Sequence, residues 1–104
     1  MFGFGPKIPE MTPQELEQHI KDRAVFVLDV RTVAEFRQAH IPQAYHIPLG
    51  ELPHRLHEVP ADRPVVTVCR SGSRSRMAAQ HLQKAGYTVH NLQGGMLQWK
   101  GPVR

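Results

Sequence analysis

Short apolar runs alternate along the chain with stretches that have helical features. The runs AVFVLDV (24–30), PVVTV (64–68) and YTVHNL (87–92) each predict a strand. The first two are almost continuously apolar, as is typical of strands that a parallel sheet buries on both faces. A smaller strand is predicted near 45–47, where the prolines of two His-Ile-Pro units favour extended or turn geometry.

The intervening segments predict helices. The helix over 12–21 has the strongest start, because Thr12 can cap it, Pro13 suits the first helical position and Glu15 completes a capping box. Further short helices are predicted over 32–39, 50–59, 75–86 and 94–100. Strands that alternate with helices in this way predict an α/β domain with a central, mostly parallel sheet flanked by helices. The helix over 75–86 is expected to bury one face, formed by Met77, Ala78, Leu82 and Ala85.

The length of 104 residues fits one domain, which we place at 11–104 behind a loosely attached, Gly/Pro-rich arm at 1–10. The single cysteine cannot form an internal disulfide. The first residues do not have the pattern of a signal peptide, and no stretch has the length of a membrane span. A cytoplasmic location without a membrane partner is the resulting expectation.

The net charge of +4 is unevenly distributed. Residues 1–62 contain all nine acidic residues and six Lys/Arg, whereas 63–104 contain seven Lys/Arg and no acidic residue. The basic residues of the second part are scattered apart from Arg70, Arg74 and Arg76, and no aromatic residues are interleaved with them. This pattern favours a local site for a small anion over a nucleic-acid partner.

The three clustered arginines follow the only thiol, in CRSGSRSR (69–76). A thiol is nucleophilic as a thiolate, so groups that stabilise negative charge activate it. Backbone N–H groups of the loop, the N-terminus of a helix starting near Ser75, the serine hydroxyls and the charges of Arg70 and Arg74 could all do so. We therefore expect Cys69 to be a nucleophile, at the carboxyl end of a central strand.

Three stretches together resemble the single-domain rhodaneses, the thiosulfate sulfurtransferases. LDVRTVAEFRQAHIPQAYHIPL (28–49) resembles the family's Asp-Val-Arg, Glu-Phe and His-Ile-Pro region, VCRSGSRS (68–75) its active-site loop, and LQGGMLQW (92–99) its Gly-Gly turn and Trp. The chain departs from the family at Ala39 and Gln43, where glycine is common, and this bears on loop geometry. The resemblance implies the family's three-layer fold, with a loop from Cys69 to Arg74 and a helix starting at Ser75.

The resemblance also implies a two-step reaction. Cys69 attacks the outer sulfur of thiosulfate, and the resulting persulfide passes its sulfur to cyanide or a cellular thiol. No cofactor and no metal are expected, and two histidines three positions apart, His54 and His57, make at best a weak metal site. The residues expected to bind the anionic donor are Arg70, Ser71, Gly72, Ser73, Arg74 and Ser75.

Two other functions compete with this one. Cysteine phosphatases and arsenate reductases need five residues between cysteine and arginine, but Ser75 occupies the required position and Arg74 comes one residue early. A sulfur-carrier or redox-sensing module would have the same loop as a rhodanese enzyme, so that alternative remains open.

Several residues outside the loop are expected to have structural roles. Asp29, Arg31 and Glu35 predict an ion-pair network behind the loop, because charges near strand ends are usually paired. His40 is expected to organise its own loop, and Phe36 and Trp99 to line the core or a groove.

Overall fold

The computed structural model describes residues 7–104 and contains a five-stranded sheet in the order β1-β5-β4-β2-β3. All the strand pairings in this part of the chain are parallel, where the sequence predicted a mostly parallel sheet. The three predicted main strands and the small one near residue 45 are all present. The strands are β1 (Glu10–Met11), β2 (Phe26–Asp29), β3 (Tyr45–His46), β4 (Val65–Val68) and β5 (Val89–Leu92).

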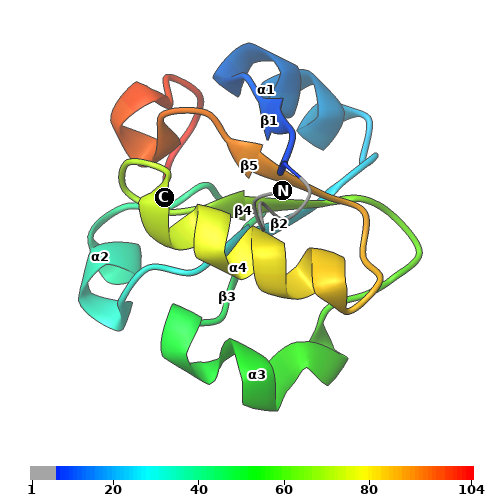
Figure 1. Cartoon of the computed structure of the whole chain (residues 1–104). Coiled ribbons are helices and arrows are strands. Elements are labelled where there is room, and N and C mark those ends of the chain that lie inside the picture. Colours follow the sequence, from blue (N-terminus) through cyan, green and yellow to red (C-terminus); the bar gives the residue numbers. More distant parts are fainter. Residues whose placement is uncertain (1–6) are drawn as a thin grey trace.

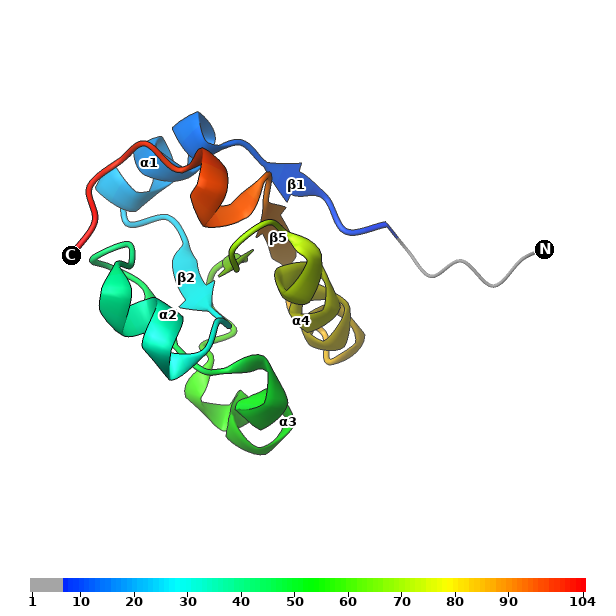
Figure 2. The same ribbon diagram turned by 90° about the vertical axis from the view of Figure 1, so that its left-hand side faces the viewer.

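Helices cover both faces of the sheet, which gives three layers (Figures 1 and 2). The α-helices are α1 (Pro13–Lys21), α2 (Val33–Gln38), α3 (Leu52–Arg55) and α4 (Ser73–Lys84). Short 3-10 segments flank α3 on both sides and follow β5. They are η1 (Leu49–Glu51), η2 (Leu56–Glu58) and η3 (Gly95–Gln98).

The sheet separates two apolar clusters. Leu28 and Val65 point to one face, where they pack with α3 and α4, while Val27 and Val66 point to the other and pack with α1 and η3. Because neighbouring residues of a strand face opposite sides, both sides of β2 and β4 must be apolar. This explains why these strands appear in the sequence as continuous apolar runs.

Two helices begin at capping boxes. Thr12 accepts a hydrogen bond from the Glu15 N–H at the start of α1, as expected from the sequence. Thr32 and Glu35 make the same reciprocal pair at the start of α2. Each box satisfies backbone N–H groups that the first turn of a helix leaves unpaired.

The helix predicted over 75–86 begins earlier than expected, at Ser73. Gly72 is its N-cap and has a φ of +112°, a conformation that glycine adopts easily, so the chain turns into the helix directly after it. The predicted buried face is also partly wrong, because Met77 is 57% exposed and Ala85 lies on the surface. The buried helix residues are Ser75, Ala78, Ala79 and Leu82.

The expected arm at 1–10 only partly corresponds to the structure, and its first six residues lie outside the described part. Ile8 is buried in the core, and Glu10 begins β1. The Asn91 N–H donates to the Pro9 carbonyl and the Gln93 N–H to the Met11 carbonyl, so this segment forms an edge strand beside β5. The packed part of the chain thus starts before the expected boundary at residue 11.

None of the helices in residues 7–104 has the length and apolar character needed to span a membrane.

Candidate active site

The candidate site lies at the carboxyl end of β4. Cys69 follows this strand directly, and β4 is the middle strand of the sheet, with β5 on one side and β2 on the other. From β2 the chain moves outward to β3, then returns to β4 and continues in the other direction to β5. The carboxyl ends of strands where the order reverses in this way are where open α/β sheets bind ligands.

The Cys69 thiol sits at the N-terminus of α4. Cys69 is 1% exposed, and its Sγ accepts hydrogen bonds from the Gly72 N–H at 3.0 Å and the Ser75 hydroxyl at 3.2 Å. Burial acts to raise the pKa of this thiol, but hydrogen bonds from the Ser75 hydroxyl and from the N–H groups of Ser75, Gly72 and Ser71 outweigh it. The net effect is a pKa below the ordinary value, which favours the nucleophilic thiolate.

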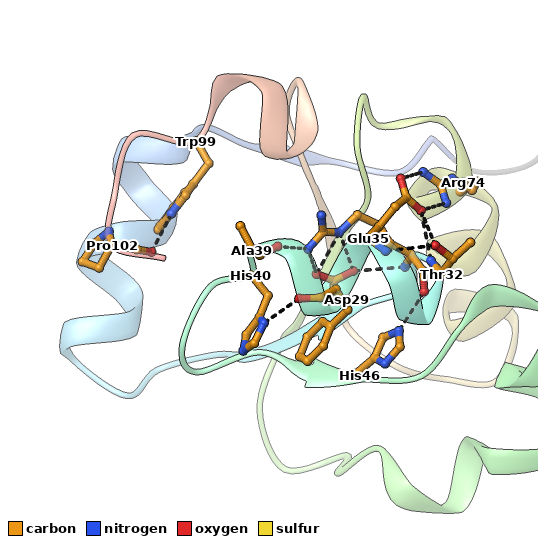
Figure 3. Close-up of polar contacts among 11 residues, drawn as sticks. Asp29, Thr32, Glu35, Ala39, His40, His46, Arg74, Trp99 and Pro102 are labelled. Atoms are coloured by element: carbon orange, nitrogen blue, oxygen red, sulfur yellow. Dashed lines mark hydrogen bonds and ion pairs between the residues drawn. The ribbon is translucent and has the colours of Figure 1, made fainter. Parts of the chain in front are cut away.

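The three arginines near the thiol have different partners. Arg74 donates through both Nη atoms to the two Glu35 oxygens, at 2.6 and 2.9 Å, and Figure 3 shows the two side chains facing each other. Arg76 is 55% exposed and pairs with Glu10 at 3.2 Å. Within residues 7–104, Arg70 is the loop arginine that makes no ion pair, and it lies on the surface.

This arrangement differs from the expectation that Arg74 faces an anion at the thiol. Both of its Nη atoms already contact a carboxylate, because α2 places Glu35 beside the first turn of α4. The hydrogen bond from Arg74 lowers the pKa of Glu35 to about 2, so Glu35 stays ionised and Arg74 stays paired. The local hydrogen bonds, rather than the arginines, are the main groups that lower the pKa of Cys69.

The rest of the expected ion-pair network lies behind the loop. Arg31 is buried and donates to both oxygens of the buried Asp29 at distances between 2.7 and 3.0 Å. Its other contact, from Nη2 to the Ala39 carbonyl at 2.8 Å, holds the end of α2. The network predicted from Asp29, Arg31 and Glu35 is therefore present as two separate pairs, a buried one between Arg31 and Asp29 and a partly exposed one between α2 and α4.

The glycine turn after β5 supports the loop from the other side. The N–H groups of Met96 and Leu97 donate to the carbonyls of Cys69 and Arg70 at 2.9 and 3.0 Å. A Cβ added to Gly95 would lie 2.5 Å from the Arg70 oxygen and 2.6 Å from the Cys69 oxygen. Only a residue without a side chain allows η3 to approach the loop this closely.

Comparisons with known proteins agree with this geometry. The family model of the rhodanese-like domain matches residues 12–102. The chain belongs to this family. It is 42% identical to a sulfurtransferase of Allochromatium vinosum over 88% of each chain. It is also 40% identical to a putative sulfur carrier protein of Bacillus subtilis, over 90% of this chain and 52% of that protein.

Solved structures show the same fold. The crystal structure of a rhodanese-related protein from Thermoplasma volcanium matches with a TM-score of 0.86 at 28% identity, covering 92% of this chain and 97% of that one. The expected rhodanese fold is therefore confirmed.

The two departures from the family pattern leave the backbone of this rhodanese domain unstrained. Ala39 is extended, with a φ of −168°, a conformation open to any residue. Gln43 is not among the residues with positive φ. Neither position needs the conformational freedom of glycine here.

His40 organises its segment of the rhodanese domain, as expected. Its Nδ1 lies 2.7 Å from the Phe36 carbonyl, and its ring stacks on the Phe36 ring with centroids 3.8 Å apart. Its backbone exchanges two hydrogen bonds with Arg104. Figure 3 shows His40 and Trp99 on the side of this region away from Arg74, and Trp99 packs against the second apolar cluster.

One residue that contacts the loop was not predicted from the sequence. Asn91 lies in β5, is fully buried, and donates from Nδ2 to the Gly72 carbonyl at 3.0 Å. In the sequence it is one of the polar residues of the run YTVHNL, and nothing local distinguishes it from a strand residue that faces solvent.

No group of three His, Cys, Asp or Glu side chains in residues 7–104 is arranged to hold a metal ion.

Proposed function

We propose that this rhodanese domain transfers a sulfane sulfur from thiosulfate to a thiophilic acceptor, cyanide or a cellular thiol, through a persulfide on Cys69. The observation that supports this most directly is the set of hydrogen bonds on the only thiol of the chain, from the Gly72 N–H and the Ser75 hydroxyl. These donors stabilise a thiolate, and they can equally stabilise the anionic persulfide that follows.

The two steps balance without a cofactor. In the first, the Cys69 thiolate attacks the outer sulfur of thiosulfate, a new S–S bond forms, and sulfite leaves with the electrons of the old one. In the second, cyanide attacks the outer sulfur of the persulfide, which yields thiocyanate and returns the thiolate. The charge of the protein is the same before and after each step, so no proton donor is required.

The donor-binding groups are proposed to be those of the loop and the first turn of α4. These are Arg70, the N–H groups of Ser71, Gly72, Ser73 and Ser75, and the hydroxyl groups of the three serines, next to the positive end of the helix. Arg74, which the sequence placed among these residues, has a different proposed part here. Its pair with Glu35 joins α2 to α4 and so fixes the helix start, while Arg70 supplies the free positive charge.

A sulfur-carrier module is the second candidate function. It is favoured by the similarity to the putative sulfur carrier protein, of which this chain spans about half the length. In that case the same Cys69 persulfide would form, but a partner protein would be needed to remove the sulfur. The reduced thiol that both functions need fits a cytoplasmic location, which is also part of this proposal.

Intact mass after treatment with thiosulfate tests the persulfide. We expect the mass of one added sulfur atom, and cyanide should remove it as thiocyanate. Cys69→Ser and protein alkylated beforehand are matched controls, since the chain has no other thiol. Sulfur uptake by either control would show that Cys69 is not the carrier. Many turnovers with thiosulfate and cyanide indicate the enzyme, whereas one sulfur per chain without turnover indicates the carrier.

A further inference from the structure

Asn91 is a buried polar side chain whose amide is engaged at both ends. Its Nδ2 donates to the Gly72 carbonyl at 3.0 Å, and its Oδ1 accepts from the Thr67 hydroxyl at 3.4 Å. Asn91 and Thr67 are themselves paired neighbours in β5 and β4. The Thr67 hydroxyl also lies 3.3 Å from the His90 carbonyl, so the Gly72 carbonyl, which can only accept, determines which way the amide is turned.

Gly72 connects this amide to the thiol. Its carbonyl accepts from Asn91 and from the Arg76 N–H, while its own N–H donates to the Cys69 sulfur at 3.0 Å. Gly72 has no side chain to restrict its rotation, so the contacts of its carbonyl help to fix the φ and ψ angles that relate this carbonyl to the Gly72 N–H. The peptide bond after Gly72 is trans, so the Ser73 N–H points opposite to the Gly72 carbonyl, away from Asn91.

We propose that Asn91 is a positioning residue of the active site, which holds the Gly72 N–H on the Cys69 sulfur by binding the Gly72 carbonyl. Asn91 does not contact the sulfur and is not a catalytic residue. The proposal rests on Cys69 being the nucleophile, as the proposed function requires. It assigns a role to β5, a strand that supplies no residue to the loop itself.

An amide suits this position better than other side chains of its size. A leucine would leave the Gly72 carbonyl and the Thr67 hydroxyl without this partner. A carboxylate would face the Gly72 carbonyl oxygen with a second acceptor and would also add negative charge near the thiol. Loss of the Asn91 contact leaves the Gly72 carbonyl held by the Arg76 N–H alone, so Gly72 can shift, which weakens the hydrogen bond to the thiolate and raises the pKa of Cys69.

The rate of alkylation of Cys69 by iodoacetamide as a function of pH tests the proposal, and it needs no sulfur donor. For Asn91→Leu we expect a midpoint at higher pH and a roughly two- to tenfold lower rate at pH values below both midpoints. Thr67→Val leaves Asn91 in place but removes the hydroxyl that contacts its Oδ1. We expect it to shift the profile in the same direction by a smaller amount.

Val66→Ala is the matched control, because Val66 is fully buried in the neighbouring position of β4 but packs in the cluster on the other face of the sheet. It should lower the stability and leave the alkylation profile unchanged. The charged groups that flank the loop, Arg70 and the Arg74–Glu35 pair, are the same in all three variants. If Asn91→Leu does not fold, as judged by circular dichroism, the alkylation profile of Thr67→Val tests the proposal instead. A shift to higher pH then supports the positioning role, and an unchanged profile contradicts it.

Two results would overturn the positioning role. One is an alkylation profile of Asn91→Leu that coincides with the wild type, and the other is an equal shift in Val66→Ala. Failure of the proposed function is a separate result, because it appears as wild-type protein that takes up no sulfur from thiosulfate.

Discussion

At the scale of single residues, the pKa of the Cys69 thiol depends on hydrogen-bond donors within six positions of it. The Ser75 hydroxyl is the side-chain donor, at 3.2 Å, and it is buried, so water cannot easily replace it. Arg74 lies close in sequence, but its charge is already balanced by Glu35. Direct hydrogen bonds therefore lower the pKa of Cys69 more than the formal charge of a neighbouring side chain does.

Ser75→Ala should raise the pKa of Cys69 more than Arg74→Ala does. A hydrogen bond to a charged group is worth about 1.5–3 kcal/mol, so alkylation below both midpoints should slow roughly tenfold or more in Ser75→Ala. The measurement is the iodoacetamide rate against pH. Arg76→Ala, which removes an exposed charge paired with Glu10, is the control and should match the wild type. A larger shift in Arg74→Ala than in Ser75→Ala would mean that long-range charge controls the thiol.

At the scale of elements, the loop is held between α2, β5 and η3. The contact with η3 depends on Gly95, where a Cβ would come within 2.6 Å of two carbonyl groups of the loop. Backbone atoms cannot move aside as a flexible side chain does, so one of the two elements must shift.

Gly95→Ala should therefore lower the free energy of unfolding by about 1–3 kcal/mol and slow sulfur uptake by Cys69. Two controls separate the causes. Gly86→Ala has the strain of a positive φ, +97°, but no atom within 4 Å of the added Cβ, and Gly50→Ala has neither feature. Denaturant unfolding and sulfur uptake are measured for all three. If Gly86→Ala impaired sulfur uptake as much as Gly95→Ala, the close approach to the loop would not be the reason.

Local signals in the sequence predicted most of the elements. The capping box at Thr12 and the apolar runs of β2 and β4 are local, and they placed a helix and two strands near their actual bounds. The edge strand β1 was not predicted because pairing with β5, rather than its own two residues, creates it.

The same limit applies to the candidate site. The loop and its thiol follow one another in the sequence, so their proximity was predictable. The partners of Arg74 and Gly72 come from distant segments. Glu35 was expected in an ion-pair network behind the loop, but nothing in the sequence indicated that its partner is Arg74 or that Asn91 meets Gly72. Met77 was misassigned because helical periodicity gives a face without showing how wide the covered part of it is.

At the scale of the whole molecule, the Arg74–Glu35 pair makes stability depend on pH. The pKa of Glu35 in the folded protein is about 2, below its ordinary value, because Arg74 and Thr32 donate hydrogen bonds to it. The unfolded chain thus binds a proton at a higher pH than the folded one. The stability that this pair contributes is present above the ordinary value and is lost as the pH falls through the folded value.

The free energy of unfolding should accordingly fall between about pH 5 and pH 2, and Glu35→Gln should flatten this decline. At pH 7 the variant should be less stable by no more than about 1 kcal/mol, since both side chains of the pair are partly exposed. Urea unfolding over this pH range measures both effects. Glu17→Gln, at a residue with no ion pair within 7–104, is the control and should keep the wild-type slope. Equal slopes for wild type and Glu35→Gln would assign the acid sensitivity to other groups.

The parallel sheet has a consequence for the order in which the site can form. Parallel neighbours cannot be joined by a tight hairpin. Each strand can therefore pair only after a distant segment of the chain has been made and has folded back beside it. The ribosome makes β5 and η3 after the thiol and its loop. These late segments provide the Asn91 amide that binds the Gly72 carbonyl and the N–H groups that bind the Cys69 and Arg70 carbonyls. A nascent chain that stops before Asn91 contains Cys69 but lacks the residues that make these contacts. The complete set of hydrogen bonds around the thiol loop can therefore form only after β5 and η3 have been synthesised.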